Sequence, residues 1–276
     1  MPENSELPSS LTVTKKIAEL LEHGDVAVVV TVTRGPNTGA KLLVDQTGNA
    51  FGSLGSQDLD SLALPQAEKF FNAREETRLS AVKDLAADFP FAGELSLLFE
   101  RLQPSPRLVV CGAGHVGAAL AKLGALLGFR TTLIDDRAEF LARDRFANEP
   151  IELVVASDWT SAVHEAIGIV PGRGGHGVSV AVVTRGHSED EQCMRAVMQV
   201  KPDYVGLIGS KRRTAIVIDR LREAGADEDE LRKIRAPIGL DIGAVSPEEV
   251  ALAIMAEIVA ERRGGAGGSL SAWRRK

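Results

Sequence analysis

Apolar and polar residues along the second half of the chain predict strands and helices in turn. Short apolar runs rich in β-branched residues predict strands at residues 108–111, 131–134, 152–156, 179–183 and 204–208. Helical spacing of apolar residues predicts helices at 115–127, 189–200, 211–224 and 247–262. Strands that alternate with helices form parallel sheets wrapped by helices. We therefore expect an α/β fold, with a parallel sheet and helices on both faces.

The first half has a different pattern, which predicts a smaller α+β domain. A helix is expected at residues 15–23, ended by Gly24. A β-branched run predicts a strand at 26–33, and a hairpin and a last strand follow at 41–53 and 94–99. Two prolines in Gln103–Pro106 favour an extended connector. The expected domains are residues 1–103 and 104–263, with a disordered Gly- and Ser-rich tail at 264–276.

Composition narrows the function classes. Of the 276 residues, 44% are hydrophobic and 25% are charged, as in ordinary globular proteins. The net charge of −6 argues against a nucleic-acid-binding protein. No apolar run approaches the roughly 20 residues of a membrane span, and the first ten residues do not resemble a signal peptide. The two cysteines, Cys111 and Cys193, lie far apart, which argues against a Cys-only zinc site and fits a reducing cytoplasm.

A glycine fingerprint follows the first strand of the second half. Gly112, Gly114 and Gly117 form the pattern G-x-G-x-x-G between a strand and a helix. In Rossmann-like domains the first glycine permits a tight turn, the second lets a pyrophosphate approach the backbone, and the third lets the helix pack closely. The N-terminus of the following helix favours phosphate. The sequence therefore predicts a Rossmann-like nucleotide- or cofactor-binding domain.

An acid at the end of the next strand supports this interpretation. Asp135 lies 23 positions after Gly112, where a carboxylate can accept hydrogen bonds from ribose hydroxyls. This position favours NAD-like ligands over NADP, although the adjacent Arg137 weakens the preference. A purely structural role for the glycines, in the turn and in helix packing, is the alternative. Hydride transfer does not follow from the fingerprint, because many chemistries share this fold.

Other polar residues fall where ligands bind in open α/β sheets, beyond the carboxyl ends of the strands. The candidates for ligand binding are His115, Arg185, His187, Gly209, Ser210, Lys211 and Arg212. His115 and His187 are also candidates for acid–base or metal chemistry. Asp241, in an apolar glycine-containing loop, is expected to be a hydrogen-bonding acid near the site and only secondarily catalytic. Solvent exposure and helix capping are the structural alternatives for this group.

Several long motifs resemble the XdhC family. They are Cys111–Gly117, Ile134–Arg137, Tyr204–Arg212, Ala236–Ala244 and Ser246–Glu257, in the family's order. The resemblance implies a maturation factor that holds molybdenum cofactor (molybdopterin), aids its sulfuration and delivers it to a xanthine dehydrogenase-type apoenzyme. It also implies a homodimer, and a cysteine desulfurase as a further partner.

The chain departs from the family at two positions. The family usually has cysteines in two N-terminal segments that read Gly55–Leu59 and Phe89–Gly93 here, without cysteine. A thiolate is a natural soft ligand in molybdenum and sulfur chemistry. The absence of both cysteines therefore implies one of two outcomes. Either His115 or His187 replaces them as a ligand, or the delivery role is lost.

Three functions are consistent with these observations. The first is a cofactor-binding maturation chaperone, rather than an enzyme, in which the glycine loop and Gly209–Arg212 hold the phosphate end of the ligand and the N-terminal domain covers it. The second is an NAD-dependent oxidoreductase, for which no compact set of acid, base and substrate-fixing residues is evident. The third is a non-catalytic nucleotide-binding regulatory module. We favour the first.

Overall fold

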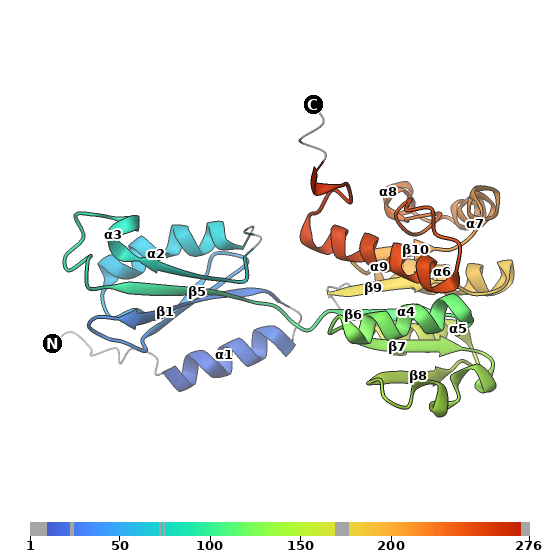
Figure 1. Cartoon of the computed structure of the whole chain (residues 1–276), viewed down its shortest axis with the longest axis horizontal. Helices are drawn as coiled ribbons and strands as arrows, with labels where there is room; N and C mark the ends of the chain where they lie inside the picture. Colours follow the sequence, from blue (N-terminus) through green and yellow to red (C-terminus); the bar gives the residue numbers. More distant parts are fainter. Residues whose placement is uncertain (1–9, 23–24, 72, 74, 169–176, 272–276) are drawn as a thin grey trace. The chain divides into compact units, whose positions relative to one another are not determined.

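The computed structural model describes the chain except for residues 1–9, 23–24, 72, 74, 169–176 and 272–276. It divides into two compact units, Met1–Pro104 and Ser105–Lys276 (Figure 1). The loop with Arg173 and His176, and the tail beyond residue 271, lie outside the described residues.

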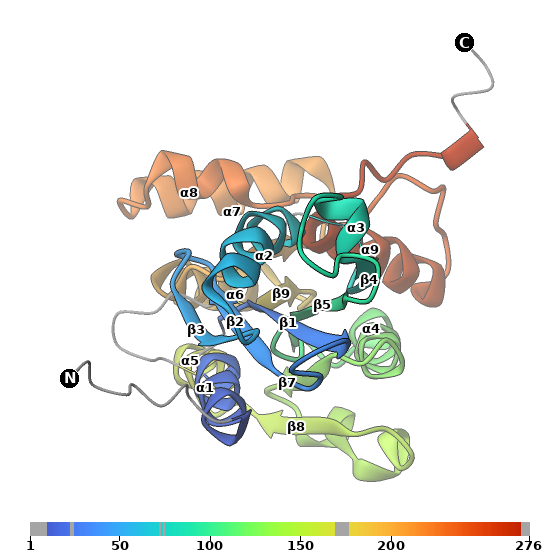
Figure 2. The same cartoon turned by 90° about the vertical axis from the view of Figure 1, so that its left-hand side faces the viewer.

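The first unit is built on a five-stranded sheet. Its elements are α1 (Ser10–Glu22), β1 (Ala27–Arg34), β2 (Lys41–Asp45), β3 (Ala50–Ser53), α2 (Gln57–Phe70), β4 (Thr77–Ala81), α3 (Val82–Leu85) and β5 (Ser96–Leu102). The strands pair antiparallel in the order β3-β2-β1-β5-β4. This sheet lies between α1 on one side and α2 on the other (Figure 2).

Alternation along β1 explains these two layers. Val28, Val30 and Val32 point into the core beneath α2, whereas Ala27 and Val29 pack against α1. Successive side chains of a strand face opposite sides, so a wholly apolar strand requires cover on both faces.

The second unit is built on a parallel sheet. Its strands are β6 (Arg107–Cys111), β7 (Arg130–Asp135), β8 (Ile151–Val155), β9 (Val178–Val182) and β10 (Tyr204–Leu207). Its α-helices are α4 (His115–Leu126), α5 (Trp159–Ile167), α6 (His187–Val200), α7 (Lys211–Glu223), α8 (Glu228–Lys233) and α9 (Pro247–Arg263). Two short 3-10 helices, Ala138–Leu141 and Arg143–Phe146, separate β7 from β8.

The strand order of this sheet places the candidate site. The order is β10-β9-β6-β7-β8, so the chain runs outward from β6 to β8 and then returns to start β9 on the other side of β6. Helices α4 and α9 cover one face, and α5 to α8 pack on the other. In open sheets of this kind, ligands bind where the order reverses, beyond the carboxyl ends of the strands. Here that point lies between β6 and β9.

The predicted fold class is confirmed: a Rossmann-like parallel sheet follows a smaller domain with an antiparallel sheet. The structure adds elements that the sequence pattern did not predict, namely α2, β4, α3, α5, α8 and the two short 3-10 helices. Within the described residues, every helix is too short or too polar to cross a membrane.

Candidate functional site

The glycine loop between β6 and α4 is held tightly from both sides. The Gly112 N–H donates to the Ile134 carbonyl of β7 at 2.7 Å. A Cβ on Gly112 would lie 2.7 Å from the Val183 carbonyl oxygen, beside β9, and the φ of Gly112 is +112°. A Cβ on Gly117 would lie 1.8 Å from the Gly112 carbonyl oxygen. Only glycine fits these two positions without displacement of the backbone.

Gly114 differs from these two glycines, because a Cβ added there would meet nothing within 4 Å. It is the N-cap of α4, with an ordinary φ of −62° and no capping side chain. The first backbone N–H groups of a helix lack intrahelical partners, and the helix dipole makes this end attractive to anions. The open space above Gly114 therefore matches the place that the fingerprint assigns to a phosphate.

Asp135 is committed to the protein, which differs from its expected role as a free ribose acceptor. One carboxylate oxygen accepts from the Ala113 N–H at 2.6 Å and from Arg137 Nη2 at 3.0 Å. The other accepts from the Arg137 N–H at 3.0 Å and from Arg137 Nε at 2.8 Å. These four bonds match the roughly four acceptor sites of a carboxylate. The residue is 1% exposed, so a ribose hydroxyl could bind only by displacing one of these donors.

The Asp135 carboxylate is held in its charged form. Burial raises the pKa of Asp135, but the hydrogen bonds from Arg137 and Ala113 outweigh burial and bring that pKa below its ordinary value. The Arg137 guanidinium also stacks on Phe140, 3.7 Å from the ring centroid. Asp135 thus fixes both the glycine loop and the stacked guanidinium.

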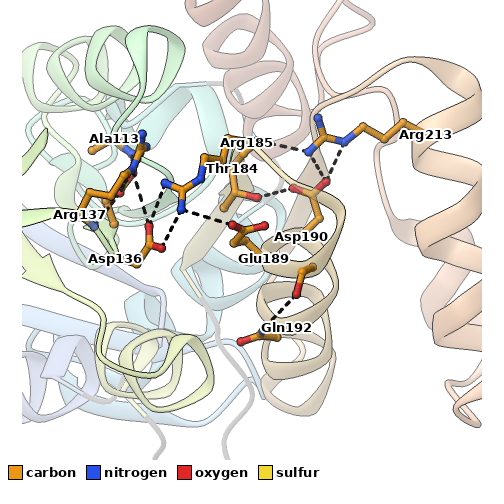
Figure 3. A network of polar contacts seen from close by, with 11 residues as sticks. Ala113, Asp136, Arg137, Thr184, Arg185, Glu189, Asp190, Gln192 and Arg213 are labelled. Carbon is orange, nitrogen blue, oxygen red and sulfur yellow. Dashed lines mark hydrogen bonds and ion pairs between the residues drawn. The ribbon is translucent and has the colours of Figure 1, made fainter.

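Asp136 and Arg185 form an ion pair (Figure 3). Asp136 follows β7 and Arg185 follows β9, and β6 lies between these strands. Arg185 donates from Nη2 to Asp136 Oδ2 at 3.1 Å and from Nη1 to Oδ1 at 3.4 Å. The same guanidinium lies 3.5 Å from Glu189 in the first turn of α6. This ion pair therefore joins the two strands that flank the glycine loop.

A second polar group lies deeper, at the start of α6. Asp190 is fully buried and accepts from Arg213 Nε at 2.9 Å and Nη2 at 2.5 Å, and from the Thr184 hydroxyl. Arg213 comes from the first turn of α7, so the pair connects the loops after β9 and β10. In the sequence, Glu189 and Asp190 follow Ser188 and suggest helix capping. No sequence pattern indicates that Asp190 is buried and pairs with a residue 23 positions away.

The turn between β10 and α7 presents cations. Ser210 is the N-cap of α7, and its hydroxyl accepts from the Arg213 N–H at 3.3 Å. Gly209 has a φ of +147°. Lys211 and Arg212 are exposed at the helix start, where positive charge is unfavourable unless an anion is near. The structure thus places Gly209–Arg212 at the carboxyl end of the parallel sheet, where the glycine loop also lies.

The three residues proposed for chemistry are placed unequally. His115 is the first residue of α4 and is exposed beside the glycine loop. His187 is the first residue of α6, but its side chain lies outside the described residues. Asp241 is exposed, so the hydrogen-bonding role that burial would have required is not needed. Within the described part of the chain, no three His, Cys, Asp or Glu side chains group into a metal site.

Both cysteines are packing residues. Cys111 and Cys193 are buried in the core cluster beneath α5 and α6. Burial raises the pKa of the Cys193 thiol, and the neighbouring Cys111 thiol adds to this effect. In the first of the two N-terminal segments without cysteine, Gly55–Leu59, Ser56 caps α2 by accepting from the Leu59 N–H at 3.3 Å.

Comparisons with known proteins agree with this geometry. Residues 108–258, more than half of the chain, match the family described as XdhC Rossmann domain. An uncharacterized protein of Escherichia coli, YqeB, is 27% identical over 237 residues, which are 84% of this chain and 42% of YqeB. A protein of Bacillus subtilis described as a probable xanthine dehydrogenase subunit is 26% identical over 61% of this chain and 46% of that protein. The chain thus spans less than half the length of these relatives.

Two further similarities cover different shares of the chain. The molybdenum cofactor insertion chaperone PaoD of Escherichia coli is 33% identical over 69 residues, 25% of this chain and 22% of PaoD. The crystal structure of a xanthine dehydrogenase from Bacillus halodurans has the same fold, with a TM-score of 0.62 and 19% identity over 91% of this chain and 66% of that one. With the glycine loop, the strand order and the family match in agreement, the chain belongs to the XdhC family.

Proposed function

We propose that the protein is an accessory factor for xanthine dehydrogenase-type molybdenum enzymes, and that it binds molybdenum cofactor for insertion. The observation that carries this proposal is the open space over Gly114 at the N-terminus of α4, in the domain that places the chain in its family. The names of two relatives, a cofactor insertion chaperone and a probable xanthine dehydrogenase subunit, point to the same process.

The residues at the carboxyl end of the parallel sheet fit the phosphate end of such a ligand. Backbone N–H groups at the start of α4 lie beside the open space at Gly114. Lys211 and Arg212 supply positive charge from the turn after β10, two strands away from β6, and Ser210 supplies a hydroxyl. The bound cofactor would supply the molybdenum and sulfur chemistry of the recipient enzyme. The role of this chain would be to hold the phosphate, to orient the ligand and to release it.

The metal end of the ligand would face different residues. Both cysteines are buried in the core, so neither is a ligand in this arrangement. His115 is exposed and follows Gly114 directly in the sequence. Its side chain could therefore contact the part of the ligand beyond the phosphate. We propose His115 and His187 for this role. The recipient apoenzyme, a cysteine desulfurase as sulfur donor, and a homodimer remain proposals from the family resemblance.

The test is the amount of pterin that copurifies with the protein. Wild type, Gly114→Val and Gly268→Val are purified without oxygen from a host that makes molybdenum cofactor. Released pterin is oxidised to its fluorescent form and compared with the amount of protein. Gly268 is the matched control, because a Cβ there also meets nothing within 4 Å, its φ is not positive, and it lies outside the glycine loop and both N-terminal segments.

We expect near-stoichiometric pterin with wild type and Gly268→Val, and none with folded Gly114→Val. Equal pterin in all three proteins would exclude the glycine loop as the binding site. No pterin in wild type, with a normal circular dichroism spectrum, would exclude the cofactor itself. A titration with NADH would then test the two alternative functions, nucleotide-dependent reduction and nucleotide-binding regulation.

A further inference from the structure

The Asp136–Arg185 ion pair lies across the approach to the glycine loop. β6 and its loop are flanked by β7 and β9, and the pair joins the segments that follow these two strands. The two ends are close to the loop backbone: Asp135 next to Asp136 accepts from the Ala113 N–H, and a Cβ on Gly112 would be 3.0 Å from the Thr184 Cα. A ligand that extends from the β7 side to the β9 side must therefore pass this ion pair.

We propose that the ion pair is exchanged on ligand binding. Arg185 gives up Asp136 and takes the ligand's diphosphate, while Asp136, which keeps its 3.7 Å contact with Arg137 Nε, accepts from hydroxyl groups of the ligand. This inference rests on the proposed binding of a phosphate at the glycine loop, and it narrows the ligand class to a diphosphate that also carries hydroxyls, as in a nucleotide diphosphate.

The contacts of the two side chains support an exchange. Both side chains are partly open to solvent, Arg185 at 48% and Asp136 at 32%, and exposed ion pairs contribute little free energy. A phosphate is a better partner for a guanidinium than one carboxylate, because it carries more charge and allows paired hydrogen bonds. Breaking the Asp136–Arg185 ion pair therefore costs little free energy. A diphosphate compensates for this cost, whereas a neutral ligand does not.

Neighbouring residues keep Arg185 near the loop during the exchange. Glu189 holds the guanidinium at 3.5 Å from the α6 side and folds back over Gly186, where an added Cβ would be 2.2 Å from Glu189 Oε2. Asp135 differs from Asp136, because its oxygens already accept four hydrogen bonds and it is buried. Of the two carboxylates at the end of β7, Asp136 is thus the one whose ion pair with Arg185 a ligand can break and whose oxygens can then accept hydrogen bonds from the ligand.

The test is the binding of inorganic pyrophosphate, measured by isothermal titration calorimetry. The proteins are wild type, Asp136→Asn, Arg185→Gln and the double variant. Glu139→Gln is the matched control, because it removes one exposed negative charge near Arg137 and has no contact with Arg185 in the described structure. Gly114→Val establishes that any binding measured is at the glycine loop.

We expect Asp136→Asn to bind pyrophosphate about two- to fivefold more tightly than wild type, the range set by one exposed ion pair. We expect Arg185→Gln and the double variant to bind about tenfold more weakly, and Glu139→Gln to match wild type. Binding by Asp136→Asn that is weaker than or equal to that of wild type would overturn the exchange. So would an equal gain in Glu139→Gln, because general charge would then explain the effect.

The two proposals can fail separately. Suppose that wild type binds pyrophosphate, that Gly114→Val does not, and that the affinity of Asp136→Asn is no higher than that of wild type. The proposed exchange is then wrong, and the binding site at the glycine loop stands. If neither wild type nor Asp136→Asn binds pyrophosphate at millimolar concentration, the exchange is also wrong, and the pterin measurement decides the proposed function independently.

Discussion

The buried Asp190–Arg213 pair makes the strongest prediction about stability. Asp190→Ala removes a carboxylate that is fully buried and accepts two bonds from Arg213 and one from the Thr184 hydroxyl. The variant leaves the Thr184 hydroxyl without its acceptor, and Arg213 keeps the Thr184 carbonyl, at 3.4 Å, as an acceptor. The link from Arg213 to the loop after β9 is then reduced to this longer bond.

The expected loss follows from what remains in the variant. Removal of one partner of a buried ion pair costs about 3–5 kcal/mol, because an uncompensated charge stays behind. The Arg213 side chain is 25% exposed, so water compensates part of its charge and we take the lower end, about 3 kcal/mol. For a domain of this size, 3 kcal/mol corresponds to a decrease in Tm of roughly 6–12 °C.

The assay is urea unfolding followed by circular dichroism, with a double-mutant cycle. The cycle uses Asp190→Ala, Arg213→Ala and the double variant, and we expect a coupling free energy of about 1–3 kcal/mol. Glu191→Ala is the control, one position further along α6. Glu191 pairs with Arg195 at 2.8 Å and with Arg220 of α7 at 3.0 Å, and both arginine side chains are about half exposed, so the loss of both pairs should cost about 1–2 kcal/mol at most.

A small effect would refute this reasoning. If Asp190→Ala costs no more than Glu191→Ala, burial of the pair does not determine its contribution. If both single variants are costly but the coupling is near zero, each residue acts through other contacts, and the loops after β9 and β10 are not joined through this pair.

Two further predictions concern the glycine loop and its acid. Gly117→Ala should destabilise the protein by about 1–3 kcal/mol, despite the better helix propensity of alanine, because its Cβ would lie 1.8 Å from the Gly112 carbonyl oxygen. Gly114→Ala should change the free energy of unfolding by less than about 1 kcal/mol, and equal stability of the two variants in urea would contradict this. Because the folded pKa of Asp135 is lowered, its contribution is present above the unfolded pKa of about 3.9 and is lost as pH falls through the folded value. Asp135→Asn should therefore be less stable at pH 7 and lose less further stability on acidification below pH 4 than wild type, as measured by thermal unfolding across that range.

The glycine fingerprint was predictable because each glycine answers a local requirement. Gly112 needs a positive φ, Gly117 needs close packing on the Gly112 carbonyl, and Gly114 needs open space. These requirements depend on a strand, a turn and a helix that are contiguous in the sequence. Strand and helix periodicity were readable for the same reason.

Contacts that depend on strand order were not predictable. Asp136 and Arg185 are 49 positions apart and meet because β9 returns to the far side of β6. The commitment of Asp135 was also hidden, since its donors include the backbone of the neighbouring strand's loop. An acid at the end of this strand can serve a ligand or the protein itself, and only its bonds distinguish the two.

The helices that were missed carry their own reasons. α2 contains Pro65, which argues against a helix interior, yet Ser56 caps it and Leu59, Ala63, Ala67 and Phe70 form one buried face. α5 begins after Asp158, whose carboxylate accepts from the Ser161 N–H. Both N-caps were visible in the sequence and indicate helix starts more reliably than the apolar pattern in these segments.

The segment after α8 closes one edge of the parallel sheet. Beyond β10, the Arg235 N–H donates to the Val205 carbonyl at 2.9 Å, the Leu207 N–H donates to the Arg235 carbonyl at 2.9 Å, and the Ile238 N–H donates to the Leu207 carbonyl at 3.0 Å. An unpaired edge strand is a template for strand addition by another chain. This edge is already paired, so a second copy that extended the sheet would have to add its strand beside β8. Addition of a strand from a second copy to this sheet would therefore be limited to the β8 side.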